Sequence, residues 1–558
     1  VEPDGSALFR VPANTPISMQ PLDADGRAIA LMRSWATVMP GETQACIGCH
    51  ESQNDAPGTT PTAASRRKPS EIKPWYGSTR GFSFKREVQP VLDKYCVGCH
   101  DGKPRKGKRT IPDFVAREAV HPKAASGAYN NGTKFTPSYM ALRSYVRAAT
   151  IESDMHMLDP YEFHASSTAL VQMLDKGHNN VKLDAEAWDR IITWIDLNAP
   201  AHGSWLEVVG DKKVTNQRQR RLAMLKLYAS IDEDLEGIAP EPAKPTAIIP
   251  KQMSAPKADK ITARGWPFTP EQAAKLQNAS AKGKMSIDAG EGVKLDLVWI
   301  PAGEFVMGSL TGHSDERPRA KVAIEKGFWI GTMEVTNAQY ARFDSKHDSR
   351  LEHGDFLQFS TRERGYPVNG PTQPLCRVSW NSAMKFCDWL SKQSGKTVTL
   401  PTEAQWEYAC RAGSAAPMSY GPTDTDFATL ANLADKSLRK MDTLGWGLPS
   451  GAVPPWKPAV ESVSDAHRVS APVGSFKPNA WGVYDMHGNV GEWTRSLYKP
   501  YPYKDDDGRN AAGGTARRVI RGGSWFDRPK CATSSFRRQY EAHQKVYNVG
   551  FRVVIEPK

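Results

Sequence analysis

The sequence KYCVGCHDG at residues 94–102 repeats the arrangement of QACIGCHES at residues 44–52. In each copy two cysteines stand three positions apart, and a histidine follows the second cysteine directly. The chain has 8 cysteines and 13 histidines, so about 0.003 such motifs are expected by chance. The two copies therefore predict one shared chemistry, for which the chain uses half of its cysteines.

Two thiols at this spacing can form thioether bonds to the vinyl groups of one haem, and the adjacent histidine then binds the iron. The residues concerned are Cys46, Cys49 and His50 for a first haem, and Cys96, Cys99 and His100 for a second. Two alternatives explain less. A thioredoxin-like dithiol needs a strand-helix-strand context and no following histidine, and a four-thiolate zinc site leaves both histidines unexplained.

We therefore predict two covalently bound c-type haems. Because such haems are attached outside the cytoplasmic membrane, we also predict a periplasmic or extracellular location, in which disulfides are permitted. The chain begins at Val1 and not at an initiator methionine, so we expect it to continue upstream.

The ligand at the sixth position of each iron decides between electron transfer and catalysis. Residues 166–200 show helical periodicity, a Gly-His-Asn-Asn loop and a second amphipathic helix. In small c-type cytochromes such a loop delivers the distal ligand, so we predict His178 as the distal ligand of the second haem. His156 and His164 are candidate ligands for the first haem or for a metal ion.

Composition excludes some classes of partner. The net charge is +12, but the basic residues are spread among 61 acidic ones, so we predict no nucleic-acid partner. No apolar run is long enough to span a membrane. Residues 1–29 alternate apolar and polar positions between Asp-Gly turns and predict short strands, whereas residues 238–260 are rich in Pro, Lys and Ala and predict an extended linker.

The first 210 residues resemble the dihaem part of hydrazine synthase alpha subunit-like proteins of planctomycetes. The similarity is carried by residues 1–13, by FKREVQPVLDKYCVGCHDGK at residues 84–103, and by the stretch from residue 160 to residue 198. In the synthase a tyrosine shortly after the first motif ligates the haem. Here CHESQNDAP at residues 49–57 contains no tyrosine, so we do not expect hydrazine synthesis from this resemblance.

From about Val293 the sequence changes to short strands, many tryptophans and Gly-rich turns. LVWIPAGEFVMGS at 297–309, YDMHGNVGEWTRS at 484–496 and RVIRGGSWFD at 518–527 resemble the formylglycine-generating (sulfatase-modifying factor) family. The resemblance implies a compact fold with little regular secondary structure, related to C-type lectins, which binds calcium through carboxylate, amide and carbonyl oxygens. The implied ligands are Asn432, Leu433, Asp465 and His467 for one ion, and Asp485, Gly488, Val490 and Glu492 for another.

The same resemblance bears on catalysis. Members that oxidise sulfatase cysteines carry two thiols after GGSW, and these thiolates hold copper. Here the first position is Asp527 and Cys531 stands alone, and one thiol cannot form a two-thiolate copper site. We therefore predict that formylglycine-generating activity is absent. By resemblance, Cys410 and Cys531 are candidates for a disulfide.

Together these observations predict a multidomain α+β protein with five segments. They are the end of a β-rich domain (1–40), a first haem-attachment segment (41–80), a mainly α cytochrome c-like domain (81–210), a helix and linker (211–290) and a formylglycine-generating-enzyme-like domain (291–558). We predict electron transfer to or from a redox partner protein. The C-terminal domain would bind a glycan, a protein or another copy of the chain. The alternative is a haem oxidoreductase that acts on a small nitrogen or oxygen species at the first haem.

Overall fold

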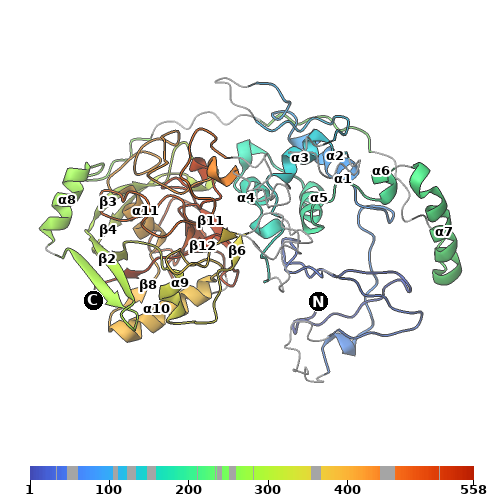
Figure 1. Ribbon diagram of the computed structural model, residues 1–558, viewed down its shortest axis with the longest axis horizontal. Coiled ribbons are helices and arrows are strands. Elements are labelled where there is room, and N and C mark those ends of the chain that lie inside the picture. Colours follow the sequence, from blue (N-terminus) through green and yellow to red (C-terminus); the bar gives the residue numbers. More distant parts are fainter. Residues whose placement is uncertain are drawn as a thin grey trace, which may run out of the picture. The chain divides into compact units, whose positions relative to one another are not determined.

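The computed structural model shows two compact units. It describes residues 1–32, 34–46, 61–104, 111–121, 134–147, 159–209, 211–232, 234, 242–250, 259–280, 282–352, 366–439, 459–514 and 516–557. The first unit comprises Val1–Ala148, Met155–Leu158 and Leu183–Ile249, and the second comprises Ala149–Asp154, Asp159–Lys182 and Pro250–Lys558. Figure 1 colours the chain along its sequence.

The N-terminal part of the first unit departs from the prediction of a β-rich segment. Its described residues up to 46 form isolated bridges, such as Ile17 with Ala36 and Leu22 with Ala28, and no extended strands. The first 40 residues contain five prolines, which lack the N–H group that a strand ladder needs. The alternating pattern was therefore interpreted wrongly as strands.

Short helices form the rest of the first unit. They are α1 (Phe84–Glu87), α2 (Gln89–Tyr95), α3 (Pro137–Arg143), α5 (Ala185–Asp196), α6 (Trp205–Val209) and α7 (Asp211–Ala229). Trp194 of α5 is fully buried, and its ring lies 5.3 Å from that of Phe84 and 6.2 Å from that of Tyr139. Helices α1, α3 and α5 therefore share a core, but a mainly α cytochrome c-like domain remains a prediction.

Residues Asp159–Lys182, which we call the docking segment, belong to the second unit. The sequence placed them within a continuous domain at 81–210, but the chain leaves the first unit before them and returns to it at Leu183. The docking segment contains η2 (Ala165–Ser167), α4 (Ala169–Asp175) and η3 (His178–Asn180). The predicted order of helix, Gly-His-Asn-Asn loop and helix is confirmed by α4, η3 and α5.

Two larger sheets and two hairpins organise the second unit within its described residues. The first sheet has the order β1-β2-β5-β13-β8, the second has the order β11-β10-β9-β12, and β3-β4 and β6-β7 are two-stranded. The strands are β1 (Lys284–Asp288), β2 (Lys294–Ile300), β3 (Gly303–Met307), β4 (Ala320–Ile324), β5 (Phe328–Gly331), β6 (Leu351–Glu352), β7 (Tyr366–Pro367), β8 (Val398–Thr399), β9 (Gly491–Leu497), β10 (Arg518–Arg521), β11 (Arg538–Tyr540), β12 (Val549–Gly550) and β13 (Val554–Ile555).

Four helices accompany these strands, and α11 contacts β3, β4, β9 and β10. They are α8 (Pro270–Ala279), α9 (Asn337–Ala341), α10 (Trp380–Ser394) and α11 (Glu403–Arg411). Thr269 caps α8, because its hydroxyl accepts a hydrogen bond from the Gln272 N–H. Long stretches between β8 and β13 are neither helix nor strand (Figure 1), as the predicted fold requires.

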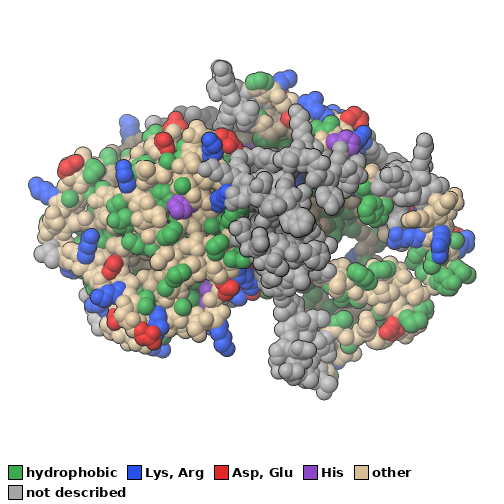
Figure 2. Space-filling view, viewed as in Figure 1, with side chains coloured by type: hydrophobic (Ala, Val, Ile, Leu, Met, Phe, Trp, Pro, Cys, Tyr) green, Lys and Arg blue, Asp and Glu red, His purple; other side chains and the backbone are tan. Residues whose placement is uncertain are grey.

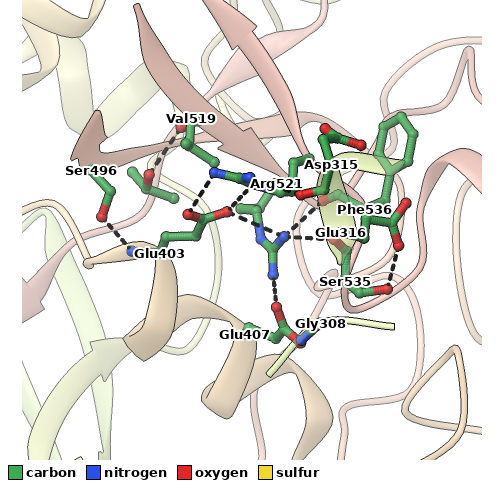
Figure 3. A network of polar contacts seen from close by, with 12 residues as sticks. Gly308, Asp315, Glu316, Glu403, Glu407, Ser496, Val519, Arg521, Ser535 and Phe536 are labelled. Atoms are coloured by element: carbon green, nitrogen blue, oxygen red, sulfur yellow. Dashed lines mark hydrogen bonds and ion pairs between the residues drawn. The ribbon is translucent and has the colours of Figure 1, made fainter. Parts of the chain in front are cut away.

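Buried ion pairs lie inside the second unit. Arg537 Nε lies 2.6 Å from a Glu403 carboxylate oxygen, and Arg521 contacts both Glu403 and Glu407 (Figure 3). All four side chains are completely buried. Burial alone would raise the pKa of Glu407, but Arg411 and Arg521 lower it below the usual value. The network is therefore charged and internally neutralised.

The buried arginines also hold irregular backbone. Arg521 donates to the carbonyls of Ser534, Ser535 and Phe536. Arg537 donates to those of Asp315 and Lys499, and Arg552 to those of Gly331 and Tyr484. A guanidinium has five N–H donors, so it can satisfy carbonyls that no strand or helix reaches.

Charged side chains of both signs lie on the surface of the described residues. On the face shown in Figure 2, Lys and Arg side chains of described residues are scattered among Asp and Glu and form no continuous basic stripe. Among the described residues, no helix is both long and apolar enough to cross a membrane.

Replacing Glu403 with glutamine should lower the free energy of unfolding of the second unit by about 3–5 kcal/mol, because the change leaves Arg537 buried without its carboxylate. Urea unfolding followed by tryptophan fluorescence measures the loss. The matched control is Glu556→Gln, which breaks the 2.7 Å pair with the partly exposed Arg495 and should cost less than about 1 kcal/mol. Equal costs for the two variants would contradict the role assigned to the buried network.

His313 should make the second unit less stable in acid. Burial, with Lys176 as the second cause, lowers the pKa of His313 from 6.5 to about 4. Between these values the unfolded chain binds a proton that the folded chain does not, so stability present above pH 6.5 is lost as the pH falls toward 4. From about pH 7.5 to pH 5, the wild type should lose roughly 2 kcal/mol more than His313→Asn. If the free energies of unfolding of the wild type and of His313→Asn changed equally with pH, this prediction would be wrong.

Candidate functional site

The second Cys-x-x-Cys-His motif forms a tight turn at the end of α2. The Cys96 N–H donates to the Leu92 carbonyl over 2.8 Å, and the N–H groups of Cys99 and His100 both donate to the Cys96 carbonyl, over 3.0 and 2.9 Å. The turn therefore places both cysteines and the histidine within one loop. A Cβ atom on Gly98 would lie 3.3 Å from Ile249 Cγ1. Ile249, which belongs to the Pro-rich linker predicted at 238–260, therefore packs against this loop.

The ring of His100 is oriented by two contacts. Its Nδ1 lies 3.0 Å from the Pro112 carbonyl oxygen, and its ring stacks on that of Phe114 at 4.6 Å. A carbonyl can only accept, so Nδ1 carries the proton and the lone pair lies on Nε2. Histidines that ligate metals commonly donate their other ring N–H to a carbonyl in this way. His100 therefore has the tautomer that an axial haem ligand needs.

The thiols of this loop do not have the character of a redox dithiol. Burial, with Cys99 as the second cause, raises the pKa of Cys96 to about 12, whereas reactive dithiols have lowered pKa values. Among the described residues, no three His, Cys, Asp or Glu side chains converge as metal ligands. The raised pKa of Cys96 argues against a redox dithiol, and covalent haem remains a prediction.

The other predicted haem residues are only partly described. Cys46 is exposed, whereas Cys49, His50 and His156 lie outside the described residues. His164 is buried, and its backbone has a φ of 72°, a conformation that non-glycine residues seldom adopt. His164 and His178 both belong to the second unit and the Cys96 loop to the first, so the assignment of His178 as distal ligand remains a prediction.

In the second unit, the position predicted to lack a catalytic thiol holds an ion pair. Arg538 Nη1 donates to Asp527 Oδ2 over 2.9 Å, and its Nη2 contacts Oδ1. Ser524 Oγ donates to the same Oδ2 over 2.7 Å. Asp527 therefore fills this position as a neutralised structural carboxylate.

The disulfide suggested between Cys410 and Cys531 is not formed, since both are free thiols. Cys410 Sγ lies 3.5 Å from His487 Nε2 and 3.6 Å from Ser534 Oγ. Burial raises the pKa of both thiols, that of Cys410 to about 12. The disulfide was suggested from the position of Cys410 in the sequence. In the structure the Cys410 thiol contacts the buried side chains of His487 and Ser534 instead.

The residues of the first predicted calcium site lie together. Asp465 accepts hydrogen bonds from the Leu433 and His467 N–H groups over 3.1 and 2.8 Å, and Asn432 Oδ1 is buried without a hydrogen-bond partner among the described residues. Burial, reinforced by Asp435, raises the pKa of Asp465 to about 7. The sequence did not single out Asp435, whose carboxylate accepts from the Asp465 N–H.

At the second predicted calcium site, one of the predicted ligands pairs with an arginine. Glu492 faces Arg552 at 2.6 Å with both groups completely buried, and Trp406 Nε1 also donates to Glu492. Asp485 Oδ1 and both carboxylate oxygens of Glu334 are buried without a partner among the described residues. Sequence reasoning missed Glu334, because it is far from Asp485 along the chain and no local motif marks it.

Asn489 joins the two predicted calcium sites. Its N–H donates to the Asn432 carbonyl over 2.9 Å, and its Oδ1 accepts from the Asn432 side chain and from the Ala471 N–H. A Cβ atom on the neighbouring Gly488, whose φ is 91°, would stand 2.1 Å from the Asn432 carbonyl oxygen. The turn at 488–489 thus requires glycine and fixes the spacing of the two clusters.

Two family models match parts of the chain. A family model described as "Sulfatase-modifying factor enzyme 1-like domain" matches residues 288–557, and a model of the hydrazine synthase alpha subunit middle domain matches residues 1–51. The formylglycine-generating enzyme of Streptomyces coelicolor is 33% identical over 277 residues, which cover 41% of this chain and 78% of that protein.

Mammalian and structural relatives were also found. The "inactive C-alpha-formylglycine-generating enzyme 2" of Bos taurus is 27% identical over 284 residues, covering 43% of this chain and 80% of that protein. The structure of PvdO from Pseudomonas aeruginosa is 29% identical, with a TM-score of 0.35, and covers 49% of this chain and 98% of that one. Through residues 288–557, the chain belongs to the sulfatase-modifying-factor family that includes the formylglycine-generating enzymes.

Proposed function

We propose that this protein is an extracytoplasmic c-type cytochrome that carries two covalent haems and transfers electrons, with a non-catalytic sulfatase-modifying-factor domain. The observation that carries the proposal is the loop at Cys96–His100. Its two cysteines and its histidine share one turn, and the Pro112 carbonyl holds His100 in the tautomer that presents Nε2. A haem bound there would supply one-electron iron chemistry, and a redox partner protein would exchange the electron.

Two further observations support the non-catalytic part. Asp527 replaces the first catalytic thiol of the family and is neutralised by Arg538, while burial raises the pKa of the remaining Cys531 thiol. A thiol with a raised pKa is a poor source of the thiolate that copper needs. Relatives described as inactive also exist in this family.

We further propose that the domain binds calcium. Asn432 Oδ1 and Asp485 Oδ1 are buried acceptors without a partner among the described residues, and such atoms are costly unless a cation or a donor meets them. Asn432 and Asp465 with the carbonyls of Leu433 and His467 would hold one ion. Asp485 with the carbonyls of Gly488 and Val490 would hold another, with Glu334 beside it and Glu492 shared with Arg552.

The haem proposal predicts the mass and the spectrum of the purified protein. The wild type should be coloured and heavier than its polypeptide by two haem groups. Changing Cys96 and Cys99 to alanine should remove one haem, because the thioether bonds to that loop cannot form. The control Cys387→Ala changes a buried cysteine outside both motifs and should leave two haems.

A colourless wild type with the mass of the bare polypeptide would disprove the haem proposal. Electron transfer makes an additional prediction, since both irons should then be six-coordinate. The ferrous protein should not bind carbon monoxide. Carbon monoxide binding at either iron would indicate an open coordination position and a catalytic haem instead.

Calcium should raise the melting temperature of the second unit by several degrees, because the ion binds the folded state alone. Differential scanning calorimetry in millimolar calcium and in EDTA measures the difference. Asp465→Asn should reduce the calcium-dependent increment, and the control Asp424→Asn, at an exposed position, should retain it. An equal melting temperature with and without calcium would refute the proposed sites.

A further inference from the structure

The docking segment is held at its start by a cluster of opposite charges. Glu162 lies 3.1 Å from Arg350 and 3.4 Å from Arg377. Asp159 lies 3.2 Å from Arg350 and 3.0 Å from Lys545. The Glu162 and Arg377 side chains are 1% and 3% exposed, so this contact is shielded from solvent and depends on charge complementarity.

Glutamine side chains fix the middle of the segment. Gln544 Nε2 donates to the Tyr161 carbonyl over 3.2 Å and reaches the Ser166 hydroxyl at 3.4 Å. Gln172 Nε2 from α4 lies 2.6 Å from the Tyr540 hydroxyl oxygen. Residues of the domain from β11 onward therefore contact both the backbone and the side chains of the docking segment.

A buried lysine anchors the end of the segment. Lys176 Nζ lies 2.5 Å from Asp315 and 4.8 Å from the centre of the Phe536 ring, and Tyr498 donates to the same Asp315 over 2.6 Å. The side chains of Lys176 and Asp315 are 7% and 12% exposed. Figure 3 shows Asp315 and Phe536 beside the buried network of Arg521, so the partner of the lysine lies next to buried charges.

Two observations distinguish this segment from the core of the domain. The family match begins at residue 288, more than a hundred residues after Lys182. Among the described residues, no backbone ladder joins the segment to either sheet. The contacts given above are made by side chains and include ion pairs, as at an interface between separable parts.

We propose that the docking segment is a built-in ligand of the sulfatase-modifying-factor domain, and that the domain acts as a clamp which immobilises it. The clamp recognises an acidic Asp-x-x-Glu pair with Arg350, Arg377 and Lys545, and it pairs one lysine with Asp315. Because the segment covers this face in cis, the face is closed to ligands in trans. The clamp holds in place the part of the chain that carries His164 and His178.

Hydrogen exchange of the full chain, read by mass spectrometry, tests the clamp. In Lys176→Asp two carboxylates face each other, so exchange in 161–172 should become at least tenfold faster while exchange in β10 is unchanged. Asp315→Lys should act in the same way, and combining the two changes should restore part of the protection. The control Lys182→Asp, at an exposed position, should leave exchange at the wild-type rate.

A peptide of residues 159–182 gives a second readout. It should bind the Lys176→Asp chain with 1:1 stoichiometry by calorimetry, because the face has been vacated, and it should not bind the wild type. Arg350→Gln loosens the opposite end and should also speed exchange in 161–172 selectively. The proposal is overturned if both single variants leave the segment protected, if they unfold the whole domain together with it, or if the peptide does not bind.

Whether the clamp also affects the haems rests on the proposed function, and it is measured separately from hydrogen exchange. Haem content by mass tests whether haems are attached at all. If two haems are present, the loosened variants should keep both and change the optical spectrum, provided that a histidine of the clamped segment is an axial ligand. If hydrogen exchange became faster while the optical spectrum stayed unchanged, the clamp proposal would stand, but neither His164 nor His178 would be an axial haem ligand.

Discussion

The second unit depends on arginines that are buried with their carboxylates. Its long irregular stretches leave carbonyls that no ladder satisfies, and a buried carbonyl without a donor is costly. Arg521, Arg537 and Arg552 meet these carbonyls with several N–H groups each, while Glu403, Glu407 and Glu492 neutralise the charge. In a domain with little regular secondary structure, the guanidinium N–H groups thus donate the hydrogen bonds that neighbouring strands would otherwise donate to these carbonyls.

An ion pair occupies the position at which the family resemblance implies a catalytic thiol. Asp527 stands at the position of a catalytic thiol and is locked by Arg538. On nearby elements, Phe536, Tyr540 and Gln544 contact the docking segment instead of facing solvent. The same scaffold that presents a reactive cysteine in the enzymes can therefore hold a piece of its own chain.

Local patterns in the sequence predicted the features that neighbouring residues determine. The helix-loop-helix around His178 involves contacts within a few positions, so spacing and residue type suffice. The strands predicted for residues 1–29 failed because alternation cannot show whether a partner strand exists. The Cys410–Cys531 pairing failed for a similar reason, since the thiol contacts depend on distant residues such as His487.

The sequence by itself determined that the chain carries two Cys-x-x-Cys-His motifs and a sulfatase-modifying-factor domain without its thiol pair, because covalent chemistry and family motifs are written in residue identity. Only the tertiary structure decided that Glu334 lies near Asp485, that Glu492 pairs with Arg552, and that Lys176 pairs with Asp315, 139 positions away. The physical reason is that charges pair through space in a low-dielectric interior, where partners are chosen by burial and not by distance along the chain.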